Sequence, residues 1–212
     1  MELLKRKNRN QFIIVIGFFL FICGIFSFTY YSFKYDSINK SEEIKIEEFF
    51  DEEQTTNKLP DTSNVEEQKK DVKQVSYDYI AVLEIPTINL KRGLVDPSSY
   101  YNNVNYNIQI INSSTFPNIE NGNFILAGHN GASYISFFKN LYKLNINDKV
   151  YVYYNNVKYE YVIENIYDTN KDGNIEIYRN HEKTTITLIT CKKNTKDKQI
   201  VYIGYLNNTS TY

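Results

Sequence analysis

Cysteine and histidine are scarce in this chain of 212 residues, which has two of each and no tryptophan. Of the two cysteines, Cys23 lies in a long apolar run near the N-terminus, so Cys191 has no plausible disulfide partner. The domain around Cys191 must therefore rely on an ordinary hydrophobic core and not on disulfide bonds. The formal net charge is −1. Because a nucleic-acid-binding protein carries a basic footprint, this charge argues against nucleic acid as a partner.

Charged residues are absent from residues 11–33, a run of 23 mostly apolar residues. A helix of that length spans roughly 34 Å, enough to cross a bilayer. Four basic residues precede the run and aromatic residues close it, which predicts a cytoplasmic N-terminus and an extracellular remainder. A cleaved signal peptide is the alternative, but the run is too long and no small-x-small cleavage site follows it. We therefore predict a cytoplasmic segment over residues 1–10 and an uncleaved, single-pass transmembrane anchor over residues 11–33.

Apolar residues are few over residues 34–75, which are rich in Glu, Asp, Lys, Asn, Ser and Thr. This composition predicts a flexible polar tether. Four apolar residues within it are enough for one or two helical turns: Ile44, Ile46, Phe49 and Phe50. Residues 76–212 then form one domain of ordinary size.

From Tyr79 onward, short apolar or alternating runs are separated by turn residues, which is typical of an all-β domain. The expected strands cover residues 79–85, 88–95, 124–127, 149–154, 157–163, 184–190 and 199–206. Asn155-Asn156, between two alternating runs, predicts a hairpin turn. Residues 135–144 carry apolar residues at helical spacing and predict a short helix. The predicted fold class is mostly β, a closed or nearly closed barrel with one or two short helices after an N-terminal transmembrane helix.

The lone thiol outside the apolar run ends the segment Thr187-Leu188-Ile189-Thr190-Cys191. His129 ends a similar segment, Phe124-Ile125-Leu126-Ala127-Gly128-His129. A thiol is mostly protonated at neutral pH and needs a basic or cationic neighbour to act as a nucleophile, and histidine is the usual one. Taken alone, Cys191 is interpreted as a small apolar residue buried at the end of a strand, and His129 as a turn residue whose hydrogen bonds are satisfied. Together they predict a nucleophile and its base.

With an anchor, a β-barrel, Ala-Gly-His after an apolar strand and a later Thr-Leu-x-Thr-Cys, the chain resembles the bacterial sortases. The resemblance covers about residues 79–206, with the tether and anchor before them. It implies a sortase-like barrel and a cysteine transpeptidase or endopeptidase that needs no metal or cofactor. The implied substrate is a Leu-Pro-x-Thr-Gly-like sorting signal of a surface protein. The enzyme would transfer the surface protein to an amine of the cell wall precursor or of a pilin.

The same resemblance implies roles for residues of this chain. Cys191 would attack the threonine carbonyl and form a thioacyl intermediate. His129 would protonate the leaving amine and later deprotonate the incoming one. The backbone near Cys191, with Thr190 as its neighbour in the motif, would help to hold the oxyanion.

One departure concerns the strand after the cysteine, where sortases generally carry an arginine. No arginine follows Arg179 in this chain, and counting back five residues from Gly204 reaches Gln199, with Lys198 beside it. Gln199 offers a neutral amide donor, whereas Lys198 offers a charge without a planar fork. We predict that Gln199 takes the arginine's place and that Lys198 or Lys192 adds positive potential. The alternative function is a catalytically weakened or inactive sortase-like surface binding module.

Two further motifs have weaker implications. Residues 168–173 copy the opening of a calcium-binding EF-hand loop, but Arg179 stands where the bidentate Glu is needed, so a polar turn is the better interpretation. In sortases this region borders the substrate groove, which implies an influence on specificity. Leu59-Pro60-Asp61-Thr62-Ser63 reads like a sorting signal with Ser in place of Gly. It is either a coincidence or a pseudosubstrate that binds in cis at high effective concentration.

Two other enzyme classes fit the sequence less well. Papain-like and cell-wall hydrolases usually place the cysteine before the histidine, which is the reverse of the order here. An L,D-transpeptidase has the order found here, but its Ser-His-Gly-Cys motif is missing around Cys191.

Overall fold

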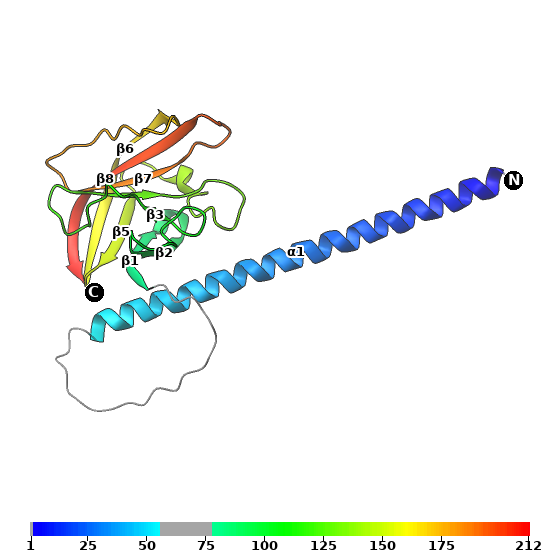
Figure 1. The fold of residues 1–212 in the computed structure, drawn as a ribbon, viewed down its shortest axis with the longest axis horizontal. Helices are drawn as coiled ribbons and strands as arrows, with labels where there is room; N and C mark the ends of the chain where they lie inside the picture. The colour runs from blue at the N-terminus through cyan, green and yellow to red at the C-terminus, as the bar shows by residue number, and fades with distance from the viewer. Residues whose placement is uncertain (1, 56–77) are drawn as a thin grey trace, which may run out of the picture. The chain divides into compact units, whose positions relative to one another are not determined.

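The computed structural model describes residues 2–55 and 78–212 (Figure 1). It contains one long helix, α1 (Glu2–Thr55), and two short 3-10 helices, η1 (Pro86–Ile88) and η2 (Leu141–Lys143). The strands are β1 (Tyr79–Ile85), β2 (Leu90–Val95), β3 (Gln109–Ile110), β4 (Asn123–Ala127), β5 (Lys149–Tyr154), β6 (Val157–Asn170), β7 (Thr185–Cys191) and β8 (Lys198–Thr211). The prediction of a mostly-β domain after an N-terminal helix is confirmed.

The strands form one eight-stranded sheet in the order β2-β1-β5-β6-β8-β7-β4-β3. Neighbouring strands are antiparallel, except that β4 and β7 run parallel. The sheet curls into a nearly closed barrel whose two edge strands are β2 and β3. Figure 1 shows the long strands β6 and β8 lying side by side along it.

Side chains bridge the two edges of the barrel where no strand ladder joins them. The buried Asn107 donates from Nδ2 to the Gly93 carbonyl at 2.9 Å and accepts from Arg92 Nε at 2.8 Å. Asn102, also buried, pairs with both backbone groups of Ile110, at 2.7 and 2.9 Å. Because an unpaired buried amide is costly, these contacts stabilise the seam as a ladder would.

The barrel interior is filled by one apolar cluster drawn from most of the strands. Its largest fully buried side chains include Tyr161, Tyr202, Phe124 and Phe138. Alternation along β7 and β8 directs every second side chain inward. This core supplies the stabilisation that the sequence could not obtain from disulfide bonds.

Local signals place several strand ends where the sequence predicts them. Pro86 follows β1, and Asn155 and Asn156 form the two-residue turn between β5 and β6 with φ of 51° and 60°. Two successive positive φ values are the geometry of the hairpin turn that Asn favours. The hairpin prediction is therefore confirmed.

The short helix predicted over residues 135–144 is wrong: turns occupy this segment, with only η2 near its end. The Phe138 amide donates to the His129 carbonyl at 3.1 Å, which is a contact outside a helical ladder. Phe138 and Leu141 are buried in the barrel core. The buried apolar residues of this segment therefore fill the barrel interior from an irregular loop and not from a helix. β3 is a two-residue strand that the sequence did not indicate.

Helix α1 holds the apolar run. Its described part from Ile14 onward includes a stretch long and apolar enough to cross a membrane. Large apolar side chains such as Phe18, Phe26 and Phe28 are exposed along it. This is the surface expected of a membrane anchor, since lipid is the solvent that such a surface fits.

The polar segment after the apolar run differs from the predicted tether. Residues 34–55 continue α1, while the rest of the predicted tether, including Leu59–Ser63, lies outside the described residues. From Ile44 onward the chain belongs to one compact unit that includes the barrel. Ile46 and Phe49, spaced as one helix face, are buried against Tyr79 of β1 and Tyr153 of β5. This packing explains why so polar a segment is helical.

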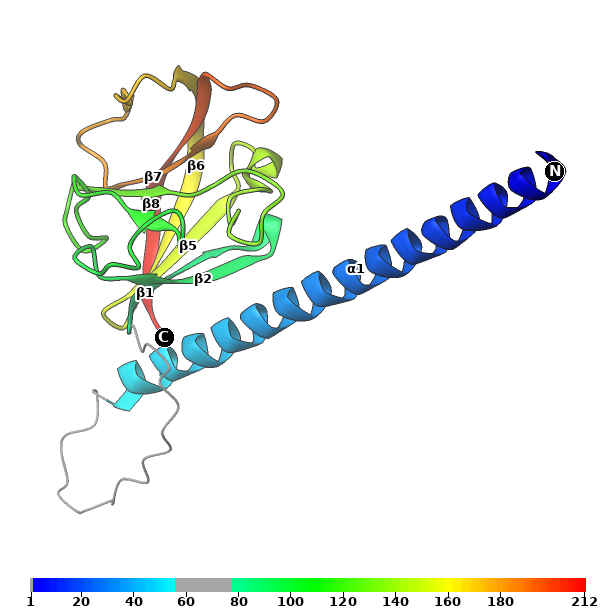
Figure 2. The ribbon, with the colours of Figure 1, turned by 45° about the vertical axis from the view of Figure 1, so that its right-hand side comes forward.

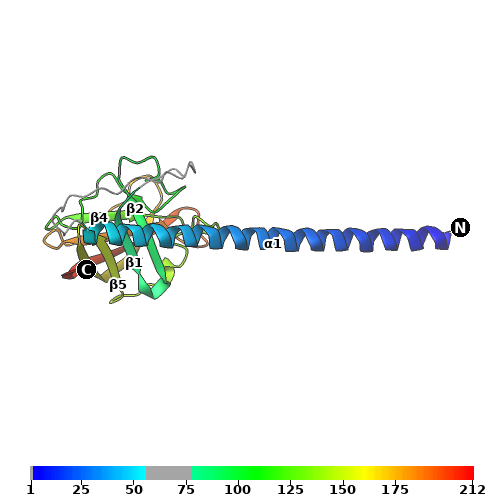
Figure 3. The same cartoon turned by 90° about the horizontal axis from the view of Figure 1, so that it is seen from below.

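We call this contact the α1-end cluster. Its buried members are Ile46, Phe49, Tyr79, Val82, Val95 and Tyr153, with Phe50 and Tyr212 packed against them. Figure 3 shows the last turns of α1 over the region of β1, β2 and β5. The rings of Phe50, Tyr153 and Tyr212 meet edge to face with centroids 5.0–5.2 Å apart. Such aromatic pairs add to the apolar area that they bury.

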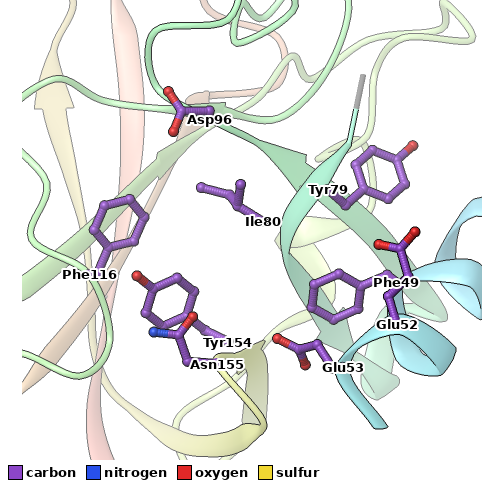
Figure 4. A pocket seen from close by; sticks show the side chains of 9 residues that line it. All are labelled: Phe49, Glu52, Glu53, Tyr79, Ile80, Asp96, Phe116, Tyr154 and Asn155. Atoms are coloured by element: carbon purple, nitrogen blue, oxygen red, sulfur yellow. The ribbon is translucent and has the colours of Figure 1, made fainter. Parts of the chain in front are cut away.

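A cavity of about 440 Å³ adjoins the α1-end cluster, near the turn from β5 to β6 (Figure 4). Nine residues line it: Phe49, Glu52, Glu53, Tyr79, Ile80, Asp96, Phe116, Tyr154 and Asn155. Burial raises the pKa of Glu53, and backbone hydrogen bonds from Asn156 and Asn155 partly oppose the shift. The cavity lies near the C-terminal end of β8, where Thr211 pairs with Val157. Gln199, which lies opposite Cys191, is near the N-terminal end of the same strand. The cavity is therefore separate from the site described next.

Candidate active site

The parallel pairing of β4 with β7 brings the two segments that carry the predicted catalytic residues to the same end of the barrel. Ala127 is the register partner of Ile189, and the Gly128 amide donates to the Ile189 carbonyl at 3.1 Å. His129 and Cys191 each lie two residues beyond this pair. Because parallel strands advance together, the histidine and the cysteine stand at equivalent positions at the ends of these two adjacent strands.

Cys191 lies where β7 emerges from the core. The six preceding residues of the strand are buried, whereas Cys191 is half-buried. Its carbonyl accepts a hydrogen bond of 2.8 Å from Asn130 Nδ2, the residue after His129. This bond holds the end of β7 to the turn that follows β4. The thiol is thus accessible on a backbone that is held in place.

His129 is half-buried and is held at both its backbone and its ring. Its carbonyl accepts from the Phe138 amide at 3.1 Å, and its ring Nε2 lies 3.3 Å from Asn105 Oδ1. An amide oxygen only accepts, so the ring donates from Nε2 in this pair. The preceding Gly128 is needed because a Cβ there would come within 2.8 Å of the Phe138 ring.

Thr190 is buried, and its hydroxyl donates to the Gly128 carbonyl at 2.8 Å. Side chains alternate across a strand, so Thr190 points to the face opposite that of Cys191. Its hydroxyl therefore joins the two segments that carry Cys191 and His129, and is not directed toward the thiol.

Gln199 is the direct register partner of Cys191 on β8, so both side chains lie on one face of the sheet. Lys198 and Lys192, the two predicted sources of positive charge, contact other groups. Lys198 Nζ donates to Asn170 Oδ1 at 2.9 Å, and Lys192 forms an ion pair with Asp168. The structure thus places Gln199 opposite Cys191 in the sheet, while both lysines contact other groups.

The cation that contacts the thiol is a residue that the sequence did not single out. Lys171 Nζ lies 3.6 Å from Cys191 Sγ, at the start of the connection from β6 to β7. The β6–β8 and β7–β8 registers pair Asn170 with Lys198 and Cys191 with Gln199, which places Lys171 beside the end of β7. Only these long-range pairings reveal the position. Asn105 and Asn130 were missed for the same reason.

The segment 168–173 is part strand and part bend. Asp168 to Asn170 complete β6, and residues 172–173 form the bend. The predicted polar turn is therefore shorter than the motif. Figure 2 shows the β6–β7 connection and the β7–β8 connection at the same end of the barrel.

An apolar strip lies on the same face of the sheet as Cys191. Four buried residues form it: Ile125, Ile189, Val201 and Ile203. Ile175 and Ile177 of the β6–β7 connection pack against the strip and remain partly exposed. The thiol is therefore next to apolar surface, with a basic and amide-rich rim.

A comparison with protein-family models matches residues 83–206 to the sortase domain. The chain belongs to the sortase family, whose members are cysteine transpeptidases in general. None of the curated proteins matches the chain.

Solved structures with a similar fold are sortases of several classes. Sortase A from Listeria monocytogenes is 23% identical with a TM-score of 0.54, covering 63% of this chain and 90% of that one. A sortase D5 transpeptidase from Clostridium perfringens is 23% identical with a TM-score of 0.56, covering 80% and 98%. Sortase C1 from Streptococcus agalactiae is 21% identical with a TM-score of 0.55, covering 61% and 69%. At these identities the likeness establishes the fold and not a subclass.

Proposed function

We propose that this sortase cleaves a Leu-Pro-x-Thr-Gly-like sorting signal with Cys191 as nucleophile and transfers the surface protein to an amine. The observation that supports the proposal is the β4–β7 register, in which His129 and Cys191 each follow two residues after the paired Ala127 and Ile189. A nucleophile and its base must come close together, because the proton must move within hydrogen-bond reach during the reaction.

The chemical steps follow from the two side chains. Cys191 loses its proton to the neutral His129 ring, and the thiolate attacks the threonine carbonyl carbon. As the tetrahedral intermediate collapses, the carbon–nitrogen bond breaks and the imidazolium gives its proton to the leaving amine. A second amine then attacks the thioacyl carbon, passes a proton to His129 and releases the Cys191 thiolate.

Ile175 and Ile177 of the β6–β7 connection are suited to the apolar residues of such a signal. They pack against the buried apolar strip on the face of Cys191 and remain partly exposed. Burying a leucine side chain against them stabilises the complex by about 1.5–3 kcal/mol. We therefore assign the β6–β7 connection to the part of the signal before the cleaved bond and to specificity.

The anchor places this chemistry outside the cell. Basic residues precede the apolar run of α1 and the barrel follows it. By the positive-inside rule, residues 1–10 stay in the cytoplasm, residues 11–33 cross the membrane and the catalytic domain is extracellular. The acceptor amine would then come from a cell wall precursor or a pilin. Resistance of Lys5 and Lys7 to a membrane-impermeant amine reagent in intact cells would support this topology, and their labelling would contradict it.

The function is tested with the full-length chain in detergent micelles and a quenched fluorescent Leu-Pro-x-Thr-Gly peptide. We expect cleavage that falls by more than about a thousandfold in Cys191→Ala and in His129→Ala. Cys23→Ala and His181→Ala are matched controls, since Cys23 lies in α1 and His181 is exposed in a turn. Mass spectrometry should find an acyl adduct on Cys191. Absence of cleavage with a panel of such peptides, and of any adduct, would contradict the proposal.

The neutral Gln199 distinguishes an active enzyme from the alternative, a sortase-like binding module. If Gln199 donates to the oxyanion, Gln199→Ala should slow peptide cleavage by roughly five- to twentyfold, because one neutral hydrogen bond is lost. Gln199→Arg should keep or raise the rate, since a charge-assisted bond is stronger. An unchanged rate in Gln199→Ala would exclude this role. Peptide binding without cleavage in the unmodified chain would favour the binding module.

A further inference from the structure

Lys171 is the basic residue whose side chain contacts the Cys191 thiol. Its Nζ lies 3.6 Å from Cys191 Sγ, within the range of a hydrogen bond to sulfur. Its backbone amide donates to the Asp197 carbonyl at 2.8 Å, so the residue is joined to the segment just before β8. Lys171 is thus held at both ends, by the chain that flanks β8 and by the thiol that ends β7.

The neighbouring lysines have acceptors of their own. Lys192 pairs with Asp168, and Lys198 donates to Asn170. Both partners belong to the end of β6, just before Lys171. Two of the acceptors near Lys171 are therefore occupied by other cations, and its own ammonium is directed to the sulfur.

A sulfur at this position reacts as the thiolate, which carries a full negative charge. An ammonium within hydrogen-bond distance favours this charged form over the thiol. Gln199, which lies opposite Cys191 on β8, carries no charge and cannot supply this effect. The His129 ring is hydrogen-bonded to Asn105, and the cation in contact with the sulfur among the described residues is Lys171.

We propose that Lys171 is a catalytic residue of this sortase, whose ammonium stabilises the Cys191 thiolate by a direct charge-assisted hydrogen bond. The inference rests on the proposed function for its place in the reaction. Lys171 keeps its three protons throughout: the thiol proton goes to His129, and the bond formed and the bond broken are those of the acyl transfer. The lysine enters from the β6–β7 connection, so the same segment that borders the apolar strip also supplies the charge.

The test measures the thiol directly, without a peptide substrate. Full-length chain in detergent micelles is treated with iodoacetamide at pH 7, and alkylation of Cys191 is followed by mass spectrometry of its peptide. Lys171→Gln should alkylate roughly three- to tenfold more slowly, because the reacting sulfur loses the ammonium that contacts it. Lys171→Arg should restore most of the rate. Lys196→Gln, which removes the same charge from an exposed position in the β7–β8 connection, should leave the rate unchanged.

Peptide cleavage by the same variants separates this inference from the function itself. Equal alkylation rates in Lys171→Gln and the unmodified chain would overturn the assignment of Lys171, whether or not peptides are cleaved. A rate that falls equally in Lys196→Gln would also overturn it, since a general loss of charge would then be the cause. Slower alkylation in Lys171→Gln only, joined to a parallel fall in peptide cleavage, would support the role. If alkylation depends on Lys171 but the unmodified chain cleaves no peptide, the proposed function fails and the lysine–thiol contact stands.

Discussion

Two threonines of β7 show how single hydroxyl groups hold the site. Thr190 Oγ1 donates to the Gly128 carbonyl, and Thr187 Oγ1 donates to Asn123 Oδ1, both at 2.8 Å and both buried. Each bond links β7 to β4. Only the first lies beside the residues that carry the thiol and the imidazole. Comparing variants of Thr190 and Thr187 therefore distinguishes an effect on stability from an effect on catalysis.

Thr190→Val should lower the free energy of unfolding by about 1–3 kcal/mol, because the Gly128 carbonyl is left without its buried donor. Peptide cleavage should fall by roughly tenfold, since the turn that carries His129 loses its link to β7. Thr187→Val should lose similar stability, measured by urea unfolding, with cleavage unchanged. Equal losses of cleavage in the two variants would show that Thr190 acts through stability alone.

Asn105 is a second single residue in contact with the proposed active site, because it accepts from the His129 ring. Asn105→Ala should reduce kcat by roughly three- to tenfold, as the ring loses the partner that selects its tautomer and orientation. The measurement is peptide cleavage under saturating substrate. Asn112→Ala, an exposed asparagine before β4, is the control. A fall in Asn105→Ala confined to KM would indicate a contact with substrate instead.

At the scale of elements, the end of α1 is held to the barrel by aromatic packing. Phe49 is 7% exposed and lies against β1 and β5 in the α1-end cluster. A helix end of this kind is stable only while its apolar face is buried, because its polar composition gives it little stability of its own.

Phe49→Ala should weaken this packing by about 3 kcal/mol, the cost of removing a buried phenylalanine side chain. We expect faster amide hydrogen exchange in residues 44–55, with exchange in β7 unchanged, because the barrel core does not include this cluster. Glu48→Ala changes an exposed residue on the same turn and serves as the control. Unchanged exchange in Phe49→Ala would show that the helix end is held by other contacts.

At the scale of the whole molecule, buried tyrosines couple stability to alkaline pH. Burial raises the pKa of Tyr202 to about 12, with Asp168 adding to the shift. Burial also raises the pKa of Tyr161 and of Tyr153, and a hydrogen bond to Glu84 adds to the shift of Tyr153. In the unfolded chain these phenols ionise near pH 10. The folded chain therefore binds more protons than the unfolded chain between pH 10 and 12, and stability falls as pH rises through this window.

Thermal unfolding followed by circular dichroism should show this as a Tm that is steady to about pH 9 and falls steeply between pH 10 and 12. Tyr161 is a sensitive test, because its buried hydroxyl has no hydrogen-bond partner within the described part of the chain. Tyr161→Phe should raise the free energy of unfolding by about 1 kcal/mol at pH 7. It should also reduce the alkaline loss. If the Tm of Tyr161→Phe had the same value and the same pH dependence as that of the unmodified chain, Tyr161 would not contribute to the alkaline loss of stability.

Much of the fold could be predicted from local signals. Pro86, the Asn155-Asn156 turn and the alternation on either side of it are short-range features, and the strands end where these residues place them. The sequence pattern of residues 135–144 does not distinguish a helix from an irregular buried loop, because both can bury apolar residues at this spacing. The helix end at Ile46 and Phe49 exceeds the one or two turns predicted there, because its stability comes from tertiary packing.

Residues close together in the chain were enough to predict the apolar helix, the barrel class and the cysteine and histidine motifs. The tertiary structure decided which side chains lie around the two motifs. Lys171, Asn105 and Gln199 reach the site from three separate connections and strands. Strand order and register set such meetings, and these depend on long-range pairing and on the packing of the whole core. For this reason the sequence predicts Cys191 as the nucleophile, whereas the lysine that contacts its sulfur is found only in the fold.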